Sequence, residues 1–101
     1  MAGKLVRDKI VEKMIGEGKQ PITHTASEQE YWQLLKQKLK EEAAEYTAME
    51  KEEELADILE VIHAIAEFKK ISFPELEKIR LKKKKDRGGF GKKIVWEGNK
   101  V

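Results

Sequence analysis

The sequence predicts an all-α fold, in which an antiparallel helical hairpin and a third helix are completed as a four-helix-type bundle by oligomerisation. Two long segments carry apolar residues at helical spacing, and two capping boxes mark helix starts. Charged residues make up 40% of the chain, which suits helices with wide solvated faces. A length of 101 residues supports one small domain, so residues 1–101 are predicted to form a single domain. Because two antiparallel helices cannot enclose their own apolar stripes, a homodimer or homotetramer is expected.

The N-terminal part is predicted to contain a short element and the start of the first long helix. Residues 4–15 are compatible with a short strand or a helix, and the glycines between residues 16 and 18 end that element. Ser27 and Glu30 form a capping box, so the first long helix is expected to start there and to run to about Ala48.

The remaining elements follow from a second capping box and a pair of glycines. The second helix is expected over residues 50–69. Ser72 and Glu75 form the second capping box, which predicts a third helix to about Lys85, and the Gly-Gly pair beyond it ends that helix. Residues 94–96 are expected to form a short extended tail.

Four carboxylates lie at positions where a packed helix should be apolar: Glu42, Glu45, Glu54 and Asp57. They form two pairs with a spacing of three residues, one pair on each of the first two helices. If the chain turns back between Met49 and Glu50, both pairs converge at matching heights on facing helices. Buried like charges are costly unless a cation compensates them, so we interpret the four residues as ligands of a divalent metal. The competing interpretation is a pair of solvated, glutamate-rich helix faces.

The carboxylates limit the metal and the chemistry that it can support. Hard oxygen ligands suit Mg²⁺ or Mn²⁺ rather than zinc, and Mg²⁺ readily takes phosphate oxygens as further ligands. A phosphoanhydride is therefore the natural substrate, because the ion neutralises phosphate charge and lowers the pKa of an attacking water. Glu41 or Glu53 could orient or deprotonate that water. A di-iron centre needs a Glu-x-x-His element, whereas His24 lies in a predicted loop and His63 faces away, so both are expected at the surface.

Composition excludes several other classes of site and location. The chain has no cysteine, and therefore neither a disulfide framework nor a thiolate zinc site. No apolar run approaches the ~20 residues that a membrane span needs, and the N-terminus lacks the apolar core of a signal peptide. A cytoplasmic protein without membrane contact is expected.

The net charge of +2 conceals two opposite blocks. Residues 41–60 are strongly acidic, whereas residues 78–93 are strongly basic and contain four consecutive lysines. The acidic block would collect a metal, and the basic block would collect the polyanion that the metal also binds. Mutual neutralisation of the blocks across the fold is a compatible alternative. The lysines could otherwise bind nucleic acid or form a solvated helix end.

Several motifs together resemble a known superfamily. Glu41-Glu42-Ala43-Ala44-Glu45 followed by Glu53-Glu54-Leu55-Ala56-Asp57 resembles the E-x-x-E…E-x-x-D pattern of the all-α nucleoside triphosphate pyrophosphohydrolases. That superfamily includes MazG, the phosphoribosyl-ATP pyrophosphohydrolases and the dimeric dUTPases. The opening Leu5-Val6-Arg7-Asp8-Lys9-Ile10 and the closing Arg87-Gly88-Gly89-Phe90 resemble its house-cleaning branch. The resemblance extends from residue 5 to about residue 95, and the short gap between the carboxylate pairs indicates a tight hairpin.

The resemblance implies a Mg²⁺-dependent hydrolysis of a nucleoside triphosphate to its monophosphate and pyrophosphate, which removes non-canonical or excess nucleotides. Mn²⁺ is expected to substitute for Mg²⁺. By this resemblance the metal ligands are Glu42, Glu45, Glu54 and Asp57. The candidates for contact with the substrate are Arg7, Lys9, Lys38, Lys84 and Arg87. Any of the four lysines at 82–85 can be aligned with the position given to Lys84.

Two other functions stay open. A non-catalytic helical module for oligomerisation or interaction would explain the helices, but the intact set of four carboxylates disfavours it. A nucleic-acid binder using the Lys-rich third helix is disfavoured by the acidic centre, which repels a phosphate backbone unless metal is present. We therefore expect a homo-oligomeric enzyme whose partner is a nucleoside triphosphate and not nucleic acid.

Overall fold

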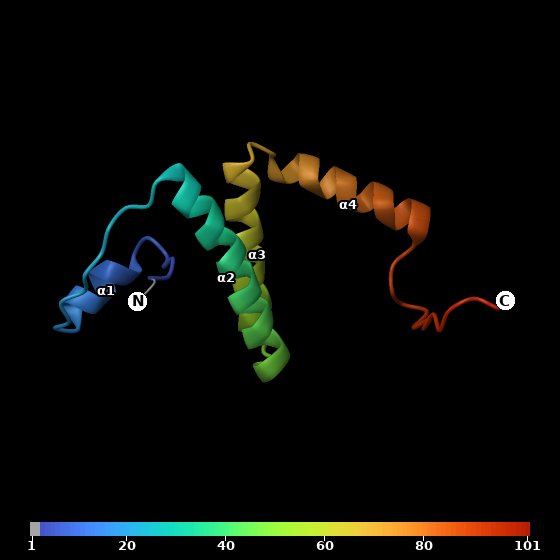
Figure 1. Cartoon of the computed structure of the whole chain (residues 1–101), viewed down its shortest axis with the longest axis horizontal. Coiled ribbons are helices and arrows are strands. Elements are labelled where there is room, and N and C mark those ends of the chain that lie inside the picture. Colours follow the sequence, from blue (N-terminus) through green and yellow to red (C-terminus); the bar gives the residue numbers. More distant parts are fainter. Residues whose placement is uncertain (1–2) are drawn as a thin grey trace.

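The computed structural model describes residues 3–101, and the regular elements of this region are all helices. In chain order they are α1 (Ile10–Gly16), α2 (Glu28–Met49), α3 (Glu52–Phe68) and α4 (Phe73–Arg87). Helices α2 and α3 lie side by side as an antiparallel hairpin, while α1 and α4 extend to opposite sides of it (Figure 1). The predicted all-α class is confirmed.

The hairpin begins and turns at residues that suit those positions. Ser27 Oγ accepts a hydrogen bond from the backbone N–H of Glu30 at 3.2 Å, as the predicted capping box requires. Helix α2 then runs for 22 residues and ends at Met49. Glu50 adopts the left-handed conformation, with φ 55° and ψ 30°, and Lys51 is extended, so two residues reverse the chain. This reversal places the acidic side chains of α2 beside those of α3.

Helix α4 has the second predicted cap. Ser72 Oγ accepts a hydrogen bond from the backbone N–H of Glu75 at 3.2 Å, and its hydroxyl donates to Glu75 Oε1 at 3.1 Å. The helix ends at Arg87, two residues beyond the predicted Lys85. Gly88 takes a φ of 84°, a conformation that is costly for residues with a Cβ atom, and so ends the helix.

The two ends of the chain are largely irregular. Of residues 4–15, which the sequence assigns to one strand or helix, the helical part is confined to Ile10 and the residues after it, and α1 ends at Gly16. Residues 94–96, predicted as an extended tail, have no regular secondary structure and are largely exposed. None of the helices in residues 3–101 is long and apolar enough to cross a membrane.

The core is small and lies between α2 and α3. Leu35, Val61 and Ala66 are buried, and the Trp32 ring stacks on Phe68 with 5.3 Å between the ring centroids. The radius of gyration is 18.1 Å, against about 13 Å for a compact chain of this length. Several larger apolar side chains of α3 and α4 are about half exposed: Leu55, Leu59, Ile79 and Leu81. A single chain is therefore an open arrangement of helices and not a closed bundle.

Candidate metal centre

The hairpin brings acidic side chains of α2 and α3 together. In each of two groups, every residue places one carboxylate oxygen within 4.8 Å of the others. The first group comprises Glu41, Glu42 and Glu45 of α2, and the second joins Glu42 to Glu54 and Asp57 of α3. The four carboxylates singled out in the sequence therefore lie together, linked by Glu42. We call these five residues the carboxylate cluster.

Glu42 is the most constrained member of the carboxylate cluster. It is a buried charged residue, with 7% of its surface exposed. Its Oε1 lies 3.3 Å from Nζ of Lys38, one turn earlier in α2. Its Oε2 is buried and has no hydrogen-bond partner within the described part of the chain. A buried carboxylate oxygen without a partner is costly, and a divalent cation would supply the missing interaction. A solvated glutamate-rich face does not account for this oxygen.

Crowding of like charge is evident at Glu45. The pKa of this carboxyl is raised above its usual value of 4.5, because its protonated form can donate a hydrogen bond to Glu42 and because the negative charge of Glu42 disfavours a second charge beside it. Desolvation and the charges of Glu54 and Glu41 act in the same direction. A proton or a cation between these two carboxylates would relieve their repulsion.

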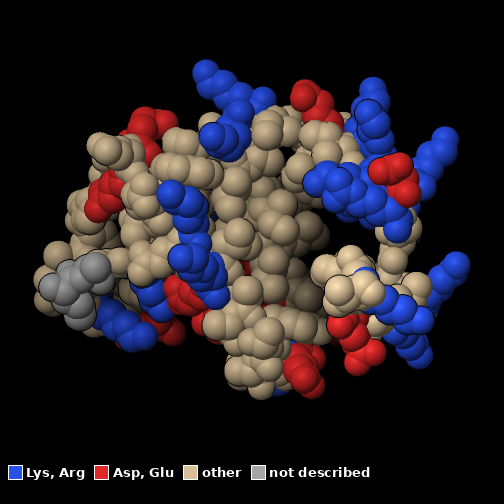
Figure 2. All heavy atoms as spheres, turned by 45° about the vertical axis from the view of Figure 1, so that its right-hand side comes forward, with Lys and Arg blue, Asp and Glu red and all other residues tan. Residues whose placement is uncertain are grey.

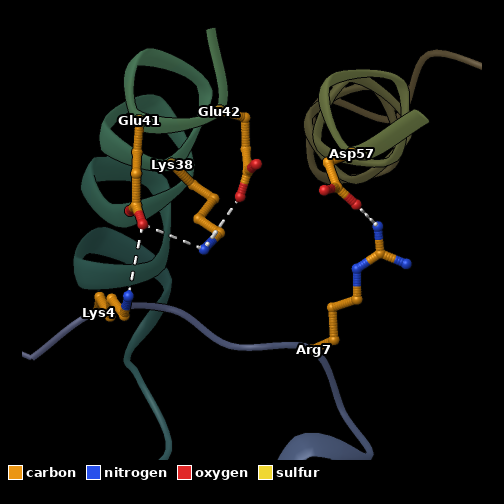
Figure 3. Close-up of polar contacts among 6 residues, drawn as sticks. All are labelled: Lys4, Arg7, Lys38, Glu41, Glu42 and Asp57. Atoms are coloured by element: carbon orange, nitrogen blue, oxygen red, sulfur yellow. Dashed lines mark hydrogen bonds and ion pairs between the residues drawn. The ribbon is translucent and has the colours of Figure 1, made fainter. Parts of the chain in front are cut away.

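The irregular N-terminal segment supplies two cations to the carboxylate cluster (Figure 3). Arg7 Nη2 donates a hydrogen bond to Oδ1 of Asp57 at 2.8 Å. Lys4 Nζ lies 3.5 Å from Oε1 of Glu41. The segment is therefore tied to α3 at one point and to α2 at another.

A pocket lies beside the carboxylate cluster. Its volume is about 280 Å³, and its charged lining includes Arg7, Lys38, Glu42 and Asp57. Lys38 also forms a second ion pair within the carboxylate cluster, in which its Nζ lies 3.7 Å from Oε1 of Glu41. Apolar side chains form other walls of the pocket, among them Leu5, Val6, Tyr31 and Leu35. A concave surface with apolar walls and a few convergent charged groups is typical of small-molecule sites.

Other residues that the sequence assigned to the site lie elsewhere. Glu53 is exposed in the first turn of α3 and belongs to neither group of the carboxylate cluster. Lys9 is exposed just before α1 and does not line the pocket. Lys84 and Arg87 lie in the last turn of α4, which extends away from the hairpin (Figure 1) and carries projecting lysine and arginine side chains (Figure 2). The basic end of α4 therefore does not reach the carboxylates of its own chain.

The two histidines lie outside the carboxylate cluster. His24 Nε2 is 3.0 Å from Oε1 of Glu30, and the exposed His63 ring stacks on Phe73 with 3.9 Å between centroids. Both are exposed, so their predicted surface placement is confirmed. In the region that the structure describes, the acidic groups contain oxygen donors alone, which is not the donor set of a di-iron centre.

Sequence reasoning missed Lys4 and the pairing of Arg7 with Asp57. The partners of these two cations lie 37 and 50 residues further along the chain, so no local spacing could indicate the contacts. The pairing of Lys38 with Glu42 is different, because residues four apart on a helix are neighbours and the spacing is visible in the sequence.

Comparison with known proteins gives one partial match. No protein family and no solved structure matches the chain. A protein of Mycolicibacterium smegmatis, described as an uncharacterized protein, is 47% identical over 45 residues. The aligned segment covers 45% of this chain and 46% of that relative, which is less than half of either protein. The similarity is limited to this segment, and the description of the relative names no activity.

Proposed function

We propose that the protein is a Mg²⁺-dependent nucleoside triphosphate pyrophosphohydrolase, which forms a monophosphate and pyrophosphate and so removes non-canonical or excess nucleotides. The observation that carries the proposal is the buried Oε2 of Glu42, which has no partner among residues 3–101 and lies within a cluster of five carboxylates. The resemblance of the carboxylate motifs to the all-α nucleoside triphosphate pyrophosphohydrolases also supports the proposal, because it involves the same residues.

In this proposal four carboxylates hold the metal: Glu42, Glu45, Glu54 and Asp57. A set of hard oxygen donors without nitrogen or sulfur suits Mg²⁺, with Mn²⁺ as a substitute. When bound, the ion would supply charge neutralisation on the phosphates and a more acidic water. Glu41 is the better candidate for the base that takes up a proton, because it belongs to the carboxylate cluster but not to the group that joins the two helices. Glu53 is the weaker candidate because it lies outside the cluster.

The pocket supplies positive charge for the triphosphate. Arg7 and Lys38 line it, and both can donate hydrogen bonds to phosphate oxygens. Lys84 and Arg87 can contact the same substrate from a second copy, because α4 extends away from its own hairpin (Figure 1). A homodimer or homotetramer would also cover the half-exposed apolar side chains of α3 and α4 and complete a four-helix core.

The test is a screen of canonical and modified nucleoside triphosphates for Mg²⁺-dependent release of pyrophosphate. Malachite green detects the product after inorganic pyrophosphatase is added, and chromatography identifies the monophosphate. Glu42→Gln should abolish the reaction. Glu52→Gln is the matched control, because it removes one negative charge from the first turn of α3 outside the carboxylate cluster. Hydrolysis of no compound in the panel, or equal hydrolysis in EDTA, would refute the proposal.

A second candidate function is nucleic-acid binding through α4. The lysines at 82–85 are exposed on a helix that extends away from the acidic hairpin, which weakens the repulsion that the acidic block would exert on a phosphate backbone. Salt-sensitive DNA binding that persists in EDTA, and that is lost when these lysines are replaced by glutamine, would favour this function.

A further inference from the structure

The carboxylate cluster carries its own counter-cations in a regular pattern. Lys38 pairs with Oε1 of Glu42 and leaves Oε2 without a partner in the described residues. Arg7 pairs with Oδ1 of Asp57 on the facing helix. A third cation, Lys4, approaches the α2 side of the cluster from the same N-terminal segment as Arg7. Among residues 3–101, one oxygen of Glu42 and one oxygen of Asp57 are thus engaged by cations of the chain, and Oε2 of Glu42 is left for another partner.

The charges of this arrangement can be counted. The five residues of the carboxylate cluster carry five negative charges when ionised, and the three cations just described pair with them. Two negative charges are left over, which is the charge that one divalent cation neutralises. Three further acids line the neighbouring pocket outside the cluster and are exposed, so solvent screens their charges: Asp8, Glu60 and Glu67.

The three cations differ in how firmly they are held. The Lys38 side chain is 19% exposed and contacts two carboxylates of the carboxylate cluster. Arg7 makes the shortest of these contacts, at 2.8 Å. Lys4 is 68% exposed and lies 3.5 Å from its partner, so solvent weakens its effect. Lys38 and Arg7 therefore dominate the internal compensation of charge.

We propose that Lys38 and Arg7 are internal counter-cations that set the metal capacity of the carboxylate cluster at one divalent cation per chain when no nucleotide is bound. The inference rests on the proposed metal site and goes beyond it, because it assigns the number of ions and the residues that fix that number. A second ion would meet fixed positive charges with no excess negative charge left to offset them. A bound triphosphate adds negative charge to the pocket, so capacity for a further ion arises with the substrate.

The test is a Mn²⁺ titration of the full chain without nucleotide, in which the electron paramagnetic resonance signal reports free Mn²⁺. The wild-type protein should bind one Mn²⁺ per chain. The Arg7→Gln, Lys38→Gln double variant leaves four negative charges in excess, so it should bind two. Its first ion should also bind at least about fivefold more tightly, since one unit charge about 4 Å from another has an effect of that order even in water, and here two cations are removed from the neighbourhood of a divalent ion.

A matched control separates this effect from the loss of any two cations. The Lys19→Gln, Arg80→Gln double variant removes the same charge from cations that pair with Glu17 and Glu77, away from the carboxylate cluster, and it should titrate like the wild type. Circular dichroism verifies that each variant is helical. If the cluster double variant does not fold, the Arg7→Gln variant replaces it in the test. This variant should fold, because the Arg7 side chain is 58% exposed and contributes little to the core. It should bind the first ion more tightly than the wild type, because it has one positive charge fewer beside the carboxylate cluster.

Each outcome decides the question. A cluster variant that binds a single Mn²⁺, at any affinity, overturns the inference, as does weaker binding of the first ion or a wild type that binds two ions. A wild type that binds one Mn²⁺ but hydrolyses no nucleotide defeats the proposed function and leaves the inference standing. Absence of Mn²⁺ binding in both the wild type and the cluster variant defeats both.

Discussion

The acidic centre of the hairpin and the basic helix α4 are both densely charged, but their charges lie in opposite environments. In the hairpin, Glu42 is buried, its neighbours crowd it, and three cations of the chain pair with the carboxylate cluster. On α4, the lysines at 82–85 are exposed, and cationic side chains project from the surface (Figure 2). The two regions therefore respond differently to a ligand of opposite charge.

This difference shows that packing, more than the number of charges, makes a specific site. A buried carboxylate is costly, so the hairpin gains from any cation that enters it. Solvated lysines near the C-terminal end of a helix already interact favourably with the helix dipole and with water. We therefore expect substitutions in the hairpin to change metal binding and chemistry, and substitutions in α4 to change substrate binding without changing metal binding.

The largest effect should follow the loss of one crowded carboxylate. If the carboxylate cluster binds the metal as proposed, Glu42→Gln and Asp57→Asn each alter a ligand, so Mg²⁺-dependent pyrophosphate release should fall by more than about a hundredfold. Metal-free Glu42→Gln should also melt at a higher temperature than the metal-free wild type, because the change relieves repulsion. Both substitutions also lose an ion pair, with Lys38 for Glu42 and with Arg7 for Asp57. Lys38 keeps Glu41 as a second partner, whereas Arg7 loses Asp57, so the melting temperature should rise less for Asp57→Asn. Calorimetry in EDTA measures both shifts, and a variant that retained most of its activity would contradict the assigned site.

A smaller effect is expected on α4. A charge-assisted contact with phosphate contributes about 1.5–3 kcal/mol, so Arg87→Ala should lower kcat/KM by about ten- to a hundredfold. The affinity for Mn²⁺ without nucleotide should stay unchanged, because Arg87 lies on the helix that extends away from the hairpin. Arg80→Ala is the control, since that arginine pairs with Glu77 on the same helix. If Arg87→Ala lowered the melting temperature and left the kinetics intact, the role in phosphate binding would be wrong.

Assembly connects the two regions. The half-exposed apolar side chains of α3 and α4 predict at least a dimer in light scattering at micromolar concentration, and Leu59→Glu should shift the mass toward that of one chain. If Arg87 acts on a second copy, mixing the Glu42→Gln and Arg87→Ala proteins should restore part of the activity. A wild-type protein that is monomeric at this concentration would exclude the arrangement.

The smallest effect concerns pH. The pKa of Glu45 is raised above 4.5, mainly by its hydrogen bond and charge interaction with Glu42. A group whose pKa is raised in the folded state contributes stability below its unfolded value and loses that contribution as the pH rises through the raised value. The metal-free protein should therefore become less stable as the pH increases from below 4.5 through that raised pKa, and Mg²⁺ should offset the loss.

Thermal melts in EDTA and in Mg²⁺ across this pH range measure the effect of Glu45. The Glu45→Gln variant is the control, because the difference between its profile and that of the wild type isolates one carboxyl group. Parallel metal-free profiles for the two proteins would show that Glu45 does not titrate abnormally in the folded state.

Features of the fold that depend on neighbouring residues could be predicted from the sequence. The capping boxes at Ser27 and Ser72 are local, because each hydroxyl bonds a residue three positions further on. The reversal at Glu50 was indicated by the symmetry of the acidic pairs rather than by its own residue type, since a glutamate with positive φ is uncommon. The convergence of Glu42 with Asp57 followed from that reversal.

Features that depend on the path of the chain could not be predicted. The contact between Arg7 and Asp57 spans 50 residues and requires an irregular segment to cross the hairpin. The direction of α4 is set between Lys69 and Ser72, where Lys70 has a φ of 59° and no glycine indicates such a turn. The sequence therefore groups the candidate substrate-binding residues at the two ends of the chain, Arg7 and Arg87, although a single chain keeps them apart.

The small core has a consequence for how the protein behaves on dilution. Among residues 3–101, the buried apolar side chains are Leu35, Val61 and Ala66, so in a dimer burial against a second copy would supply a large share of the folding free energy. If the chain dimerises as proposed, its folding follows mass action, and each tenfold dilution lowers the stability of the dimer by about 1.4 kcal/mol. The carboxylates of α2 and α3 would come together only while enough chains are present, which makes the concentration of the protein itself a control on the site.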